Sequence, residues 1–165
     1  SNIIFKLYSF NNLFSFKNGQ PYSHYNTNVN NSFNNFFGVQ CEPVYEVIAN
    51  TPLFKKKNYL NVSIYCKQTK FFSDKIITEA GQKSYLFLDN FKQALYFSFA
   101  PFLRDINTLK DVNKDATTNN NPFSEGDPLY GLWLSIRLIG DPAKLGQYFE
   151  ILGVIIDSFD REKTG

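Results

Sequence analysis

Apolar and polar residues alternate with a period of two along two long segments of the chain. The apolar positions of the first segment, residues 58–67, are Leu60, Val62, Ile64 and Cys66. In the second, residues 130–139, every even position is leucine, isoleucine or tyrosine. A period of two is typical of a strand with one face in a core. Both segments are therefore predicted to be strands.

Shorter strands and one hairpin are predicted between long polar stretches. Residues 14–17 precede Asn18-Gly19, which suits the type I′ turn of a hairpin. The polar stretches lie near residues 22–36 and 111–128, and loops of this length often make contacts. The shorter strand candidates are residues 3–10, 44–49, 85–88 and 95–99.

The C-terminal segment, residues 143–159, fits two structures. Asp141 and Pro142 suit the cap and first turn of a helix, and apolar residues then recur at helical spacing. Two glycines interrupt that helix, however, and the β-branched run at 154–156 prefers a sheet. We favour a tight turn followed by a strand over residues 147–157.

The composition supports a sheet rather than a helical bundle. The chain has 165 residues, with 18 Phe, 10 Tyr, one Trp and no Met. Aromatic side chains bury large areas and favour pleated surfaces. We expect a single, mainly β domain over residues 1–165, an antiparallel sandwich or small barrel with long polar loops and at most one or two short helices.

The charge pattern argues against nucleic acid as a partner. The net charge is +2, and the longest basic run, residues 55–57, lies beside Thr51-Pro52. A solvated loop explains that run better than a phosphate-binding patch, which needs more basic residues on one face. No apolar run approaches the ~20 residues needed to cross a bilayer, so no membrane span is expected. The sequence does not begin with Met, and its first residues lack the regions of a signal peptide. We therefore expect a processed or excised piece.

No residue pattern indicates catalysis. His24 is the single histidine, and neither Cys41 nor Cys66 has flanking residues typical of a nucleophile or a zinc site. A bridge between the two cysteines is left open. We expect no enzyme, no cofactor and no metal, and we interpret the loop carboxylates as turn formers. These are Asp105, Asp111, Asp115, Glu125 and Asp127.

Aromatic residues provide the candidate binding groups. Tyr59 and Tyr65 fall on the polar face of the first strand, where a lectin-like surface would place them. Other aromatics either anchor loops on the core or bury in a neighbouring subunit. The candidate interface residues are Tyr22, Tyr25, Phe33, Phe36, Phe37 and Trp133.

The second long strand ends in Gly140, Asp141 and Pro142, a structural turn in which Gly frees the backbone and Pro fixes the exit. This strand–Gly-Asp-Pro–strand pattern, over residues 130–156, resembles one in tail and baseplate-hub proteins of tailed bacteriophages. The resemblance implies a small barrel or sandwich that packs against other subunits.

Two functions are consistent with these features. The first is a structural assembly protein in a phage or viral particle, located in the virion, acting through contacts with other protein subunits or its own copies. The alternative is a carbohydrate- or cell-surface-binding β-sandwich of the adhesin or lectin type, located outside the cell.

Overall fold

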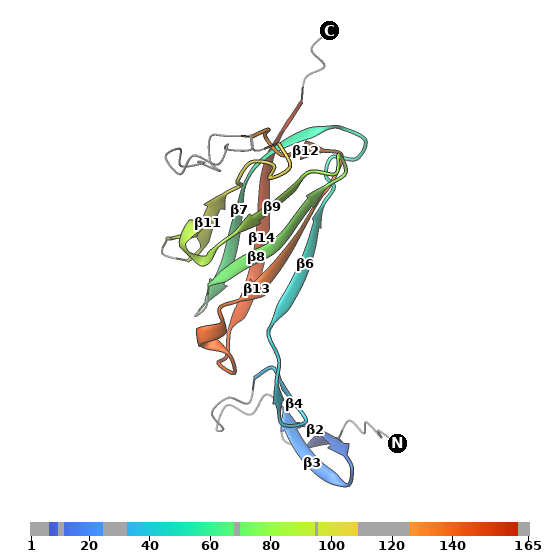
Figure 1. Ribbon diagram of the computed structural model, residues 1–165. Coiled ribbons are helices and arrows are strands. Elements are labelled where there is room, and N and C mark those ends of the chain that lie inside the picture. Colours follow the sequence, from blue (N-terminus) through green and yellow to red (C-terminus); the bar gives the residue numbers. More distant parts are fainter. Residues whose placement is uncertain are drawn as a thin grey trace.

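The structure is a computed structural model, and it describes residues 7–9, 12–24, 33–67, 70–94, 96–108 and 126–161. The described chain is mainly β, as predicted, and its larger part is a sandwich of two antiparallel sheets (Figure 1). Within the described ranges neither sheet closes into a barrel. The two 3-10 turns are η1 (Leu88–Asn90) and η2 (Pro142–Lys144).

The first sheet, called sheet one, is built around a single long strand, β7 (Lys57–Lys67). Strand β14 (Glu150–Asp160) pairs with one edge of β7 from end to end. Two shorter strands, β11 (Ser98–Pro101) and β12 (Tyr130–Gly131), share the other edge. Beyond β11 lies β10 (Lys92–Gln93).

The second sheet, called sheet two, has the strand order β6-β13-β8-β9. Its central strand β13 pairs with β6 on one side and β8 on the other. A short link through η1 joins β9 to β10, so these two edge strands lie on the same side of the sandwich. The bounds are β6 (Val44–Ala49), β8 (Phe71–Thr78), β9 (Lys83–Leu86) and β13 (Leu134–Gly140).

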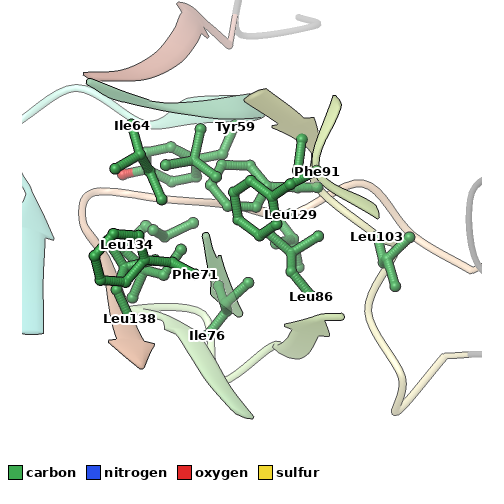
Figure 2. Packing of buried hydrophobic residues seen from close by; sticks show 14 of the residues in the cluster. Tyr59, Ile64, Phe71, Ile76, Leu86, Phe91, Leu103, Leu129, Leu134 and Leu138 are labelled. Atoms are coloured by element: carbon green, nitrogen blue, oxygen red, sulfur yellow. The ribbon is translucent and has the colours of Figure 1, made fainter. Parts of the chain in front are cut away.

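The core lies between the two sheets and receives side chains from both (Figure 2). Val62 and Ile64 of β7 face Leu134, Ile136 and Leu138 of β13, and all five are fully buried. Alternate residues point inward because the pleat turns successive side chains to opposite faces. Burying such residues supplies roughly 1.5–3 kcal/mol per side chain.

A small N-terminal unit stands apart from the two large sheets (Figure 1). At the predicted hairpin turn, Asn18 and Gly19 have φ values of 53° and 78°, as a type I′ turn requires. Phe33 links the unit to the sandwich, since its ring lies 5.2 Å from that of Tyr148. The unit comprises β1 (Leu7–Ser9), β2 (Asn12–Lys17), β3 (Gln20–His24), β4 (Asn35–Phe36) and β5 (Val39–Gln40).

The prediction of which β7 residues face the core is wrong at the start of the strand. Leu60 is 47% exposed, whereas Tyr59, predicted to face outward, is only 4% exposed and lies in the core (Figure 2). The reason is a bulge: β14 pairs Asp157 with Asn61 and Ser158 with Tyr59, so Leu60 is an extra residue. A bulge shifts the alternation by one position, which turns Leu60 out and Tyr59 in.

The predicted strand over residues 130–139 is split between the two sheets. Tyr130 and Gly131 pair with β7 in sheet one, and β13 begins at Leu134 in sheet two. Gly131 has a φ of 156°, and a Cβ there would lie 3.2 Å from the Glu79 amide nitrogen. The glycine therefore lets the chain change sheets in a tight space.

The C-terminal segment is a strand and not a helix. β13 ends at Gly140, Asp141 caps η2 by accepting a 2.9 Å hydrogen bond from the Ala143 amide, and β14 follows. Gly140 also approaches the chain before β6, because its amide donates to the Pro43 carbonyl at 3.0 Å. The Gly-Asp-Pro turn thus carries the chain from sheet two to sheet one.

Candidate interaction surfaces

The outer face of sheet two carries polar pairs between its strands, and the exposed Ile48 of β6 lies opposite Ser135 on the same face. Ser135 donates a 3.0 Å hydrogen bond to Glu46, and Arg137 lies 3.4 Å from Asp74. Each pair joins neighbouring strands of the sheet. Exposed pairs of this kind contribute little to stability, but they keep the face hydrated.

The outer face of sheet one is aromatic. The ring of Tyr65 stacks on that of Phe97, with centroids 5.3 Å apart and an interplanar angle of 30°. Phe97 in turn lies 6.2 Å from Phe99 in β11. We call these three side chains the aromatic platform. Tyr96 stands beside it and is largely exposed.

Small and polar residues border the aromatic platform. Gly153 of β14 pairs with Tyr65 and has no side chain, and a Cβ there would meet no atom within 4 Å. Along the same two strands, Ile155 pairs with Ser63 and Asp157 with Asn61. The face therefore combines flat aromatic rings with hydroxyl, amide and carboxylate groups.

The outer edge of β14 is the longest strand edge of sheet one that has no pairing partner among the described residues. Three large apolar residues along it, Leu152, Ile155 and Phe159, are about half exposed. The strand contains neither proline nor lysine, which are common protections of a free edge. Its two bulges leave residues 153–157 in regular pairing. We call this surface the β14 edge.

Strand β6 forms the corresponding edge of sheet two on the same side of the sandwich. The ring of Tyr45 in β6 lies 6.3 Å from that of Phe149, the residue before β14. Val44 and Ile48 of β6 are also exposed. Apolar side chains thus extend from one sheet edge to the other.

The described residues that were predicted as an interface do not form one surface. Tyr22 and Phe37 pack edge to face at 5.4 Å within the N-terminal unit, and Phe36 lies 5.7 Å from the ring of His24. Phe33 contacts Tyr148, as described above. These four aromatics therefore contact other rings of the same chain.

Trp133 does not join these aromatics. Trp133 follows β12 at the far end of the sandwich, half-buried, and its carbonyl accepts a hydrogen bond from the Glu79 amide. Tyr25 lies outside the described residues, as do most of the two polar stretches predicted near residues 22–36 and 111–128.

His24 pairs with a serine that sequence reasoning did not connect to it. The Ser15 hydroxyl lies 2.5 Å from His24 Nε2, and Nδ1 lies 3.1 Å from the Asn35 carbonyl oxygen. Since a carbonyl only accepts, Nδ1 carries the proton and Nε2 accepts from Ser15. The spacing resembles a nucleophile–base pair. Both side chains are buried, however, and we interpret the pair as a polar tie between β2, β3 and β4.

The structure describes both cysteines and, of the loop acids, Asp105 and Asp127, whereas Asp111, Asp115 and Glu125 lie outside the described residues. Cys41 and Cys66 are not joined by a disulfide, and Cys66 is part of the core. Asp105 is buried, and its Oδ1 accepts hydrogen bonds from the amides of Lys83 and Asn107 at 2.9 and 3.1 Å. Among the described residues, no group of three or more His, Cys, Asp or Glu is placed to hold a metal.

A cavity of about 300 Å³ lies beside the start of β7. Its lining combines apolar side chains with Asn58 and Arg104, and the described lining residues include no carboxylate. The paired carboxylates of a glycosidase are therefore not found there. The other lining residues are Tyr59, Leu60, Phe102, Leu103, Pro128, Leu129 and Phe159.

No protein-family model matches the sequence, and no curated protein matches it either. No helix within the described parts of the chain is both long and apolar enough to cross a membrane.

Proposed function

We propose that this chain is a structural assembly protein that acts through contacts with other protein subunits, copies of itself included. The observation that carries the proposal is the β14 edge. A long, unpaired strand edge offers a row of amide and carbonyl groups to which another strand can add. Three half-exposed apolar side chains lie along the same edge.

The expected gain from covering this edge is substantial. Fully burying a large apolar side chain contributes ~1.5–3 kcal/mol, and Leu152, Ile155 and Phe159 are each about half buried already. Covering all three therefore contributes roughly 2–5 kcal/mol per copy, before any backbone hydrogen bonds.

Size-exclusion chromatography with light scattering tests the proposal. The wild-type chain is expected to associate, and Ile155→Lys is expected to shift it toward the monomer. Lys75→Glu, on an exposed position of β8 in the other sheet, is the matched control and should leave the mass unchanged. A wild-type chain that stays monomeric at every accessible concentration would contradict the proposal.

We further propose that the assembly is a viral particle, with the chain in a tail- or baseplate-like position. The support is the resemblance of residues 130–156 to phage tail and baseplate-hub proteins, together with a Gly-Asp-Pro turn that joins two sheets of a sandwich. Peptides of the chain should then sediment with purified particles at a constant ratio. Their separation from particles on a density gradient would refute this assignment.

The aromatic platform favours a second candidate function, the binding of carbohydrate outside the cell. Stacked rings beside hydroxyl, amide and carboxylate groups suit a sugar, which has apolar ring faces and polar edges. The stack of Tyr65 on Phe97, across from the side-chain-free Gly153, is the specific observation. A glycan array with and without a chelator tests it, with Tyr65→Ala as the variant expected to lose binding. Absence of binding under both conditions would exclude this function and leave the assembly proposal unaffected.

A further inference from the structure

The loop between β6 and β7, residues 50–56, displays two apolar side chains to solvent. Phe54 is 90% exposed and Leu53 is 61% exposed. Burying large apolar side chains is favourable, so a monomer gains nothing from holding these two in solvent. Scattered exposed apolar residues are ordinary, but two neighbours at the tip of a protruding loop form a local patch.

Several interactions hold the loop in this conformation. Lys57, at the start of β7, is buried, and its Nζ donates a 2.8 Å hydrogen bond to the Pro52 carbonyl. Desolvation lowers the pKa of Lys57, an effect that the nearby Asp160 partly opposes. Phe54 itself has a φ of 63°, which is unfavourable for a residue with a side chain. A strained residue persists only where its surroundings determine the conformation.

The far end of the loop is tied to the last residues of β14 and to Arg161. Lys55 Nζ lies 3.0 Å from Asp160, and the Arg161 amide donates a 2.9 Å hydrogen bond to the Lys56 carbonyl. The Arg161 guanidinium lies 4.2 Å from the ring centroid of Tyr130. The tip is thus anchored at both ends while its two apolar side chains remain uncovered.

Cations surround the base of this tip. Lys55, Lys56 and Arg161 lie next to the loop, and the neighbouring acids are Asp160 and Glu79. Glu79 reaches this end through its 3.4 Å hydrogen bond from the Leu132 amide. These five described residues sum to one positive charge, and Lys57 lies beside them at the start of β7. An apolar tip above a cationic base matches the layers of a membrane surface, where phosphate-bearing headgroups lie outside the acyl chains.

We propose that the loop of residues 50–56 binds the surface of an anionic membrane, with Leu53 and Phe54 inserted among the acyl chains and Lys55 and Lys56 at the headgroups. Binding by one loop is shallow and reversible, since it uses two apolar side chains and a few charges. It is independent of the assembly proposal, because it uses the end of the sandwich and not the β14 edge.

Vesicle sedimentation with the full chain tests the proposal. The probe is phosphatidylcholine vesicles containing phosphatidylserine, compared with phosphatidylcholine alone. Wild type should sediment with the anionic vesicles and be released as salt is raised. The double variant Leu53→Ser, Phe54→Ser should bind about tenfold or more weakly. Lys55→Gln, Lys56→Gln should bind roughly tenfold more weakly.

Two controls separate insertion from other causes. Phe87→Ser removes another exposed phenylalanine, located between β9 and η1, and should leave vesicle binding unchanged. A Phe54→Trp variant should show a blue shift in tryptophan fluorescence with anionic vesicles, measured against the Trp133 background of the wild type. Equal melting temperatures would show that the variants fold.

Three results would overturn the proposal. In the first, the wild-type protein stays in the supernatant with anionic vesicles. In the second, the Leu53→Ser, Phe54→Ser variant still binds these vesicles. In the third, the fluorescence emission of Phe54→Trp does not change when they are added. If the tip binds a protein pocket and the chain does not associate with vesicles, the loop binds a protein partner and the membrane proposal is refuted.

Discussion

The buried phenol of Tyr59 makes the stability of this protein sensitive to alkaline pH. Its ring lies in the core (Figure 2). Its hydroxyl faces the Gly131 carbonyl at 3.5 Å. Desolvation, with a smaller contribution from the charge of Glu79, raises the pKa of Tyr59 from 10.0 to about 12. Burial disfavours the charged form of an acid, so the folded state retains the proton longer than the unfolded chain.

The direction and size of the effect follow from proton binding. Between pH 10 and pH 12 the folded state holds more protons than the unfolded state, so the free energy of unfolding falls as the pH rises. One pKa unit corresponds to about 1.4 kcal/mol, and the loss therefore reaches roughly 2–3 kcal/mol at pH 12. About half of it is expected by pH 11.

Tyr59→Phe is the variant that isolates this effect. It keeps the ring and removes the ionisable hydroxyl, whose hydrogen bond is long. Urea unfolding of both proteins between about pH 9 and 11 gives the difference in unfolding free energy as a function of pH. Lys57, whose pKa is lowered by burial, makes stability rise toward pH 10.5, but this contribution is common to both proteins and cancels. Parallel curves for wild type and variant would refute the assignment to Tyr59.

Four further substitutions test the packing described above, three by urea unfolding and one by amide exchange. Gly140→Ala places a Cβ 2.5 Å from Pro43 Cγ and should lower the free energy of unfolding by about 1–3 kcal/mol. The Cβ of Gly153→Ala meets no atom within 4 Å, so this variant should be nearly as stable as the wild type. Equal effects of the two substitutions would contradict the steric explanation. Asp105→Ala leaves two backbone amides without their acceptor and should cost about 2–4 kcal/mol, so a loss under 1 kcal/mol would argue against the turn. Ser15→Ala should raise amide exchange in the N-terminal unit while the sandwich stays protected; unchanged exchange would show that the histidine pair does not hold the unit together.

Local patterns in the sequence were sufficient for several elements of the fold. The strand at Val44–Ala49 was predicted with its observed bounds, and Asn18-Gly19 forms the predicted hairpin turn. Strand β8 was missed because its register with β9 shifts between Ser73 and Ile76, which places the exposed pair Asp74 and Lys75 side by side. Bulges of this kind interrupt the period of two on which the predictions depend.

The interaction surfaces could not be predicted in the same way. Tyr65, Phe97 and Gly153 meet only because three strands from distant parts of the sequence lie side by side. The free edge of β14 depends on which strand ends the sheet, and no local pattern determines that order. The many aromatic residues near positions 22–37 led to the prediction of an interface. The described ones contact rings of the N-terminal unit or of the sandwich.

The pairing of β7 with β14 also determines when the protein can fold during its synthesis. Lys57 pairs with Asp160, so more than half of the chain must follow Lys57 before its partner has been made. Until then β7 has one edge open along its whole length, and sheets with such distant pairings form slowly. A growing or truncated chain therefore presents the strand edge on which another chain's β14 could pair in place of its own.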